Sequence, residues 1–193
     1  MGSKIKVTLL QNNQGEIVDG PLILSPEVFH DNRGFFYESW NLKKINKLLA
    51  KNINFDQDCI SHSKKGVIRG LHFQIPPYEQ EKLVSCLSGE IFDVIVDLRN
   101  NSKTYKTYIA IKLDESEKKQ LYVPKGFAHG FMALSKHASV FYKISGEYSF
   151  LNQRSLKWND NDLKIKWPLN KVKPIISEKD MLAKNFKLIE QEL

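Results

Sequence analysis

The 193-residue chain has 41% hydrophobic and 26% charged residues, a composition typical of a soluble globular protein with one buried core. It contains no apolar run long enough to span a bilayer, its first residues lack the apolar core of a signal peptide, and its two cysteines, Cys59 and Cys86, are too few for a disulfide scaffold. We therefore expect a single domain over residues 1–193, located in the reducing cytoplasm and without membrane contact.

The net charge of +7 has two interpretations. Excess lysine and arginine can neutralise nucleic-acid phosphates. The lysines are scattered over polar stretches, however, and no nucleic-acid-binding motif accompanies them. We therefore predict a solvated basic surface and no nucleic-acid partner, although the same field would favour a small anionic substrate such as a nucleotide diphosphate.

Apolar residues alternate in short segments through the middle of the chain, after one helical segment near its start. Leu42–Lys51 carries leucine and isoleucine at helical spacing, and Ser177–Ala183 predicts a second short helix capped by Ser177. The predicted strands are Lys82–Leu87, Gly89–Leu98, Tyr105–Leu113, Lys119–Val123, Gly130–Ala133 and Ala138–Ile144. This pattern predicts an all-β sandwich or barrel with a few short peripheral helices.

Four clusters of polar residues interrupt these apolar segments. They are Phe29–Trp40; Gly66–Gln74 followed by Glu81–Val84; Val123–Phe131; and Tyr142–Tyr148 with Trp158–Asp160. A histidine close to an arginine and a lysine, all flanked by aliphatic residues, is unusual for a purely structural core.

Metal binding is the first hypothesis to consider for such clusters. Pro124, Gly126 and His129 match the second motif of the cupins, which are small β-barrels that often hold a metal. The first motif would need a second histidine two residues after His72, where Gln74 stands instead. Because a divalent metal needs several converging ligands, we predict that the protein binds none.

Together, the clusters resemble the dTDP-4-dehydrorhamnose 3,5-epimerase family, cupin-type enzymes of jelly-roll fold that work without metal or other cofactor. The resemblance extends from about Leu24 to Asp180. It rests on the runs Arg69-Gly-Leu-His-Phe-Gln74, Lys82-Leu-Val and Pro124-x-Gly-Phe-Ala-His-Gly130, which occur in the family's order. It implies an isomerase that inverts C3, C5 or both in a nucleotide-linked 4-keto-6-deoxy sugar.

The resemblance implies four catalytic residues. His72 would be the general base that removes a proton beside the C4 ketone, and Asp180 would fix its tautomer. Lys82 would stabilise the enolate, and Tyr142 would return a proton to the opposite face.

By the same resemblance, seven further residues would bind substrate, and the enzyme would be a homodimer whose partner chain lends residues near Arg33. They are Arg33 and Arg69 on the diphosphate, Tyr148 stacked on the base, and Glu38, Gln57, His129 and Lys179.

Cys59 and Gln153 depart from the family's usual asparagine and glutamate, which leaves the sugar and the nucleotide open. A single-carbon epimerase, a 3,4-ketoisomerase and an epimerase of a GDP-linked 4-keto-heptose are the enzyme alternatives. A sugar-nucleotide-binding cupin without catalysis is the alternative of another class.

Several of these residues also have structural interpretations. His72 and His129 could be satisfied core histidines. Arg33 could simply pair with an acidic neighbour, although Asn32-Arg33-Gly34 predicts an exposed turn from which it could reach a ligand. The six-residue separation of Tyr142 and Tyr148 places both on one face of a regular strand, unless a turn at Ser145-Gly146 intervenes. We assign Asp93 and Asp97 to hydrogen bonds within the barrel and leave both out of the site.

Overall fold

Most of the chain forms β-strands, as the alternating apolar segments predict. The computed structural model describes residues 4–193, so the first three residues, which entered the signal-peptide argument, lie outside the described part. The strands are β1 (Ile5–Gln11), β2 (Ile17–Pro26), β3 (Val28–Asp31), β4 (Gly34–Tyr37), β5 (Phe55–Lys64), β6 (Ile68–Gln74), β7 (Lys82–Ser88), β8 (Glu90–Asp97), β9 (Tyr108–Asp114), β10 (Gln120–Val123), β11 (Phe127–Ala133), β12 (His137–Ser145) and β13 (Gln153–Ser155).

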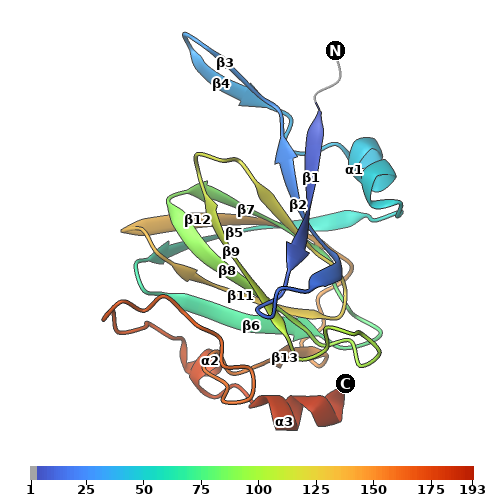
Figure 1. Ribbon diagram of the computed structural model, residues 1–193, viewed down its shortest axis with the longest axis vertical. Coiled ribbons are helices and arrows are strands. Elements are labelled where there is room, and N and C mark those ends of the chain that lie inside the picture. Colours follow the sequence, from blue (N-terminus) through green and yellow to red (C-terminus); the bar gives the residue numbers. More distant parts are fainter. Residues whose placement is uncertain (1–3) are drawn as a thin grey trace.

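Two antiparallel sheets face each other in the body of the molecule (Figure 1). One has six strands in the order β1-β2-β10-β7-β12-β5, and the other has five in the order β13-β6-β11-β8-β9. Strands distant in sequence thus lie side by side, which is typical of a jelly roll. The predicted all-β jelly-roll fold is confirmed.

Strand β8 shows how the sequence pattern builds both layers of the core. Ile91 and Ile95 point between the sheets and join the inner cluster, while Val94 and Val96 point to the other face of the five-stranded sheet. There they pack in one cluster with Phe186 of the C-terminal segment. The period-two alternation therefore gives β8 two buried faces.

The helices are short and peripheral. Helix α1 (Leu42–Leu49) begins after Asn41, whose side chain accepts a hydrogen bond from the backbone N–H of Lys44. Helix α2 (Glu178–Met181) is capped in the same way by Ser177, as predicted. Helix α3 (Phe186–Ile189) and a final 3₁₀ turn (Glu190–Glu192) follow, and the C-terminal helices lie beneath β6 and β13 in Figure 1. Within residues 4–193, none of the helices has the length and apolarity needed to cross a bilayer.

The hairpin of β3 and β4 projects away from the body of the molecule (Figure 1). Its aromatic side chains are exposed, with Phe29 at 46%, Phe35 at 54% and Phe36 at 71%. Arg33 lies in the turn between the two strands, as predicted, and forms an ion pair with Asp31 at 2.6 Å. Such an exposed aromatic surface on a protruding element is typical of a protein–protein contact.

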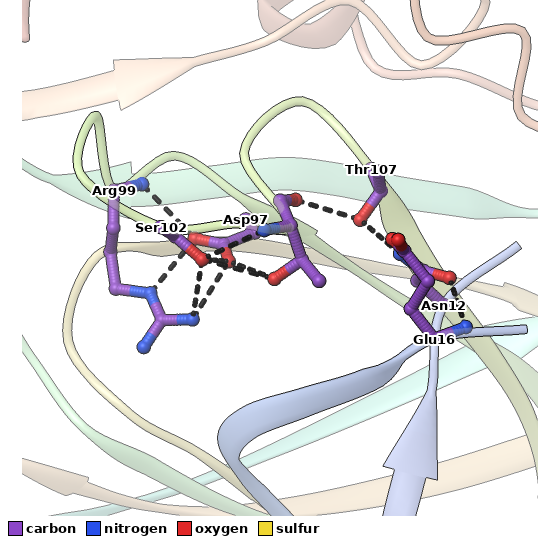
Figure 2. Close-up of polar contacts among 7 residues, drawn as sticks. Asn12, Glu16, Asp97, Arg99, Ser102 and Thr107 are labelled. Atoms are coloured by element: carbon purple, nitrogen blue, oxygen red, sulfur yellow. Dashed lines mark hydrogen bonds and ion pairs between the residues drawn. The ribbon is translucent and has the colours of Figure 1, made fainter. Parts of the chain in front are cut away.

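A polar network closes the turn that follows β8 (Figure 2). The buried carboxylate of Asp97 accepts hydrogen bonds from the guanidinium of Arg99 and from the hydroxyls of Ser102 and Thr104. Thr107 continues the network to Asn12 in the β1–β2 turn. These bonds outweigh the effect of burial and hold the pKa of Asp97 below its usual value. The prediction that Asp97 hydrogen-bonds within the barrel is confirmed.

Candidate active site

A cavity of about 550 Å³ opens between the two sheets, and the segment from Ile175 to Asp180 borders it. The six-stranded sheet contributes β5, β7 and β12 to its wall, and the five-stranded sheet contributes β6 and β11. The residues of the predicted site that line it are Arg69, His72, Lys82, His129, Tyr142, Lys179 and Asp180. The structure thus brings together the four predicted catalytic side chains from four separate segments.

His72 lies on β6 and is oriented by Asp180 from α2. The distance between His72 Nε2 and Asp180 Oδ1 is 2.6 Å, and the backbone N–H of Gly70 donates to the other carboxylate oxygen. Burial would raise the pKa of Asp180, but the bonds from His72, Gly70 and Ser177 outweigh it and hold the pKa below its usual value. An ionised carboxylate can only accept, so His72 Nε2 carries the hydrogen and Nδ1 is the basic nitrogen.

A bulge in β6 brings Arg69 to the same cavity as His72. His72 pairs with His129 across the β6–β11 ladder, whereas the next pair in register is Arg69 with Phe131. Two residues of β6, Gly70 and Leu71, therefore oppose one residue of β11, and this extra residue reverses the side on which Arg69 lies. Regular alternation would place residues three apart on opposite faces.

Lys82 and Tyr142 reach the cavity from the opposite sheet. They lie on the neighbouring strands β7 and β12, where Lys82 pairs with Ile144 and Tyr142 pairs with Val84. Burial lowers the pKa of Lys82 to about 8, against the opposing effect of the negative charge of Asp93. Burial also raises the pKa of Tyr142, whose hydroxyl lies 3.1 Å from that of Ser61. At neutral pH the cavity thus holds a lysine that can be cationic and a protonated phenol.

Asp93 forms a hydrogen bond within the barrel, as predicted, and its partner is a residue of the cavity wall. Its carboxylate lies 2.7 Å from Nε2 of His129, and both side chains are almost completely buried. The alternation of β8 correctly places Asp93 on the inner face, but only the register of β8 against β11 brings it to His129. His129 is thus both a satisfied core histidine and a residue that lines the cavity.

Four predicted binding residues lie outside the cavity wall, namely Arg33, Glu38, Gln57 and Tyr148. Arg33 is on the projecting hairpin, and Glu38 follows that hairpin, where it forms an ion pair with Lys44 at 2.6 Å. Gln57 is exposed on β5, on the same side of the strand as Cys59, which lines the cavity. Within one chain, Arg33 forms an ion pair with Asp31, which is the structural interpretation considered for it.

Tyr148 does not share a strand with Tyr142. Strand β12 ends at Ser145, so the turn at Ser145-Gly146, which the sequence allowed, separates the two tyrosines. Tyr148 is exposed and donates to Gln153 Oε1 at 2.8 Å, and Lys179 donates to the same oxygen at 2.7 Å. These three residues form a small polar cluster, which Lys179 joins to the cavity.

Metal-binding geometry is not found in the described part of the chain. Among residues 4–193, no three histidine, cysteine, aspartate or glutamate side chains converge as ligands of one ion would. Both cysteines are free thiols, with Cys86 buried and Cys59 half-buried.

The fold and this site together define a protein of the jelly-roll class, with two imidazole–carboxylate pairs on one side of its cavity and a lysine and a tyrosine on the other. A family model described as dTDP-4-dehydrorhamnose 3,5-epimerase matches residues 16–187. The chain belongs to this family of isomerases, as the motifs predict.

Individual relatives agree with this assignment. The dTDP-4-dehydrorhamnose 3,5-epimerase of Salmonella typhimurium is 46% identical over 84% of this chain and 88% of its own length. The crystal structure of the enzyme of that name from Elizabethkingia anophelis superposes with a TM-score of 0.86 at 44% identity, covering 97% and 98% of the two chains. A dTDP-6-deoxy-D-glucose-3,5-epimerase from Legionella pneumophila, solved with dTDP-4-keto-L-rhamnose, gives a TM-score of 0.88 at 40% identity over 97% and 96%.

Proposed function

We propose that this enzyme inverts C3 and C5 of a dTDP-linked 4-keto-6-deoxy hexose, without a metal or redox cofactor. One observation carries the proposal: His72 and Tyr142 line the same cavity from opposite sheets. A sugar ring held between the sheets would present one face to a base and the other to an acid. Inversion of a carbon needs this arrangement, because a single base could only exchange the proton on one face.

The His72–Asp180 pair starts the reaction. The C–H bond beside the C4 ketone is weakened by the carbonyl, and Nδ1 of His72 takes its proton while the electron pair moves to O4. The imidazolium that forms is stabilised by Asp180 at 2.6 Å. Asp180 thus provides orientation and countercharge, and the proton stays on the imidazole.

Lys82 and Tyr142 complete the inversion. The ammonium of Lys82 is suited to stabilise the negative charge on O4, which is greatest in the enolate. Tyr142 then donates its hydroxyl proton to the opposite face of the same carbon. The double bond of the enolate returns to the ketone, and the carbon has the inverted configuration. Solvent afterwards restores the protonation states of His72 and Tyr142.

The diphosphate and the base occupy the open side of the cavity in this proposal. Arg69 and Lys179 lie on the cavity wall and carry the positive charge that phosphate oxygens need. Tyr148 beside Lys179 offers an exposed ring on which a pyrimidine can stack. Gln153 holds both Tyr148 and Lys179, so a neutral amide here replaces a carboxylate that would repel the nucleotide.

A homodimer supplies the remaining binding residues. The hairpin of β3 and β4 carries Arg33 away from the cavity of its own chain, and its exposed phenylalanines need a partner surface. We propose that each hairpin reaches the cavity of the partner, where Arg33 exchanges Asp31 for a substrate phosphate. The two unpaired cysteines support a location in the reducing cytoplasm.

Proton NMR in D₂O tests the reaction with dTDP-4-keto-6-deoxyglucose and with GDP-linked hexose and heptose analogues. Deuterium at both C3 and C5 of the dTDP sugar is the expected result, and His72→Asn should abolish it while nucleotide affinity is retained. Label at one carbon only would instead identify a single-carbon epimerase, and label only in a GDP sugar would change the substrate. Nucleotide binding with no label in any substrate would overturn the catalytic proposal in favour of a binding module.

A further inference from the structure

The carboxylate of Asp93 is the most deeply buried charged group next to the cavity, with an exposed fraction of 0%. One oxygen, Oδ1, accepts from His129 Nε2 at 2.7 Å. The other oxygen, Oδ2, is the single buried side-chain polar atom in the described part of the chain that lacks a hydrogen-bond partner. A carboxylate so placed destabilises the fold unless a nearby positive charge compensates it.

The groups around Asp93 come from three other strands. His129 lies on β11, Lys82 and the thiol of Cys86 lie on β7, and Tyr142 lies on β12. Lys82 is the only one of these four that is ordinarily cationic at neutral pH. The negative charge of Asp93 raises the pKa of Lys82 against the larger, lowering effect of burial. The ring of His129 meets that of Tyr142 edge to face, with centroids 6.1 Å apart.

We infer that Asp93 is a positioning residue of this site, which fixes the Nε2–H tautomer of His129 and keeps the buried ammonium of Lys82 charged. The inference rests on the proposed function for its catalytic meaning, because only a charged Lys82 can stabilise an enolate. One buried carboxylate thereby acts on both sheets. It controls the imidazole that lines the cavity on β11 and the cation that faces it on β7.

Asp97 provides the matched comparison, because it lies four residues along the same strand and on the same inner face. Its two oxygens are saturated by Arg99, Ser102 and Thr104, so it has the partners expected of a structural carboxylate. Asp93 has one imidazole partner and an open oxygen instead. This difference suits a group whose charge acts on a neighbouring cation rather than on the fold alone.

The first test measures the tautomer of His129 in the wild-type protein. Long-range ¹H–¹⁵N correlations distinguish the two neutral tautomers, and the His129→Gln variant assigns the signal. We expect the hydrogen on Nε2. A hydrogen on Nδ1, with Nε2 as acceptor, would overturn the part of the inference that concerns His129.

The second test compares Asp93→Asn with Asp97→Asn. The titration of Lys82 is followed by the ¹³Cε signal of labelled lysine, assigned with Lys82→Met, and by the pH dependence of kcat/KM. In Asp93→Asn the loss of the negative charge should lower the Lys82 midpoint from about 8 by about one pH unit. The alkaline limb of kcat/KM should then move to lower pH, with about tenfold less activity than wild type at pH 9. Asp97→Asn should lower the Tm and leave the Lys82 midpoint in place.

An unchanged Lys82 midpoint in folded Asp93→Asn would overturn the inference about the ammonium. If Asp93→Asn does not fold, the wild-type midpoint decides, because a value well below 8 would mean that no carboxylate supports the charge. Neither NMR measurement requires turnover, so both remain valid if the wild-type enzyme labels no substrate. In that event the proposed function fails while the inference about charge and tautomer stands.

Discussion

The two imidazole–carboxylate pairs differ in exposure more than in geometry. His72 and Asp180 are 2.6 Å apart, with 30% of the histidine side chain exposed, whereas His129 and Asp93 are 2.7 Å apart, with 4% of the histidine exposed. A base must exchange protons with substrate and with solvent in every turnover, which favours the exposed pair. The buried pair of His129 and Asp93 is better suited to holding a fixed hydrogen-bonding pattern.

Asp180→Asn tests the exposed pair at the level of the side chain. We expect kcat to fall by about 100-fold or more, because the amide neither stabilises the imidazolium nor fixes its tautomer. The KM should change little, since Asp180 does not hold the nucleotide in our proposal. Steady-state kinetics measures both constants, and a kcat close to that of wild type would contradict the orienting role.

The stability of the same variant has a defined pH dependence. The pKa of Asp180 is lowered in the folded protein, so its ionised form stabilises the fold above the unfolded-state pKa of 3.8, and this contribution is lost as the pH falls through the folded-state pKa. The difference in Tm between wild type and Asp180→Asn should therefore shrink between pH 5 and pH 2. Thermal melts across this range measure it, and a difference that grows with acidity would contradict the assignment.

The two cysteines provide an independent probe of the cavity. Cys59 is half-buried and lines the cavity, whereas Cys86 is buried and burial raises its pKa to about 12. Iodoacetamide at pH 8 should therefore alkylate Cys59 and spare Cys86. Bound dTDP should slow the reaction if the nucleotide sugar occupies this cavity. Mass spectrometry of the peptides reads out both sites, and Cys59→Ser controls for unspecific labelling.

At the scale of the elements, the projecting hairpin carries three exposed phenylalanine side chains. Its turn was evident in Asn32-Arg33-Gly34, but no pattern in one sequence shows that the hairpin projects from the body of the molecule.

The other elements also differ in how far the sequence predicts them. Strands rich in apolar residues, from Lys82 to Ile144, were predictable from the sequence, whereas β5 has polar residues on both faces and was missed. The four-residue helix α3 is too short for helical periodicity to reveal it.

Replacing Phe35 and Phe36 by serine tests the role of the hairpin. Removing two exposed rings should convert a dimer to a monomer, because the proposed interface loses its apolar contact. Light scattering measures the mass, and kcat/KM should fall with it as Arg33 no longer reaches the partner. Leu188→Ser, which removes an exposed apolar side chain on α3 at the opposite end of the molecule, is the control and should leave the mass unchanged. A variant hairpin that retains the dimer mass would contradict the proposed interface.

At the scale of the whole molecule, the order of the strands assembles the site from segments that are distant in sequence. The resemblance to a known family was sufficient to name His72, Lys82, Tyr142 and Asp180, all of which line one cavity. The contact between Asp93 and His129 could not be predicted, because alternation assigns a residue to a face but does not identify its neighbours across the ladder. The same limit applies to Arg69, whose side of β6 depends on an irregularity in register that alternation excludes.

The net charge of +7 acts on the whole molecule and predicts a salt effect. A nucleotide diphosphate is attracted to a cationic protein, and salt screens this attraction beyond about 8 Å at physiological ionic strength. The value of kcat/KM should therefore fall severalfold between 20 and 500 mM NaCl, while kcat at saturating substrate should change little. Initial rates at several salt concentrations measure both, and a kcat/KM independent of salt would contradict electrostatic steering.

The bulge at Gly70 and Leu71 makes the register of β6 a chemical property. Without it, a regular ladder of the same length would place Arg69 and His72 on opposite faces and turn either the guanidinium or the imidazole out of the cavity. Substitutions at Gly70 or Leu71 that favour a regular strand should therefore alter the cavity wall even though neither residue carries a charge. A shift of one residue in register would leave only one of the two side chains, Arg69 or His72, beside the cavity.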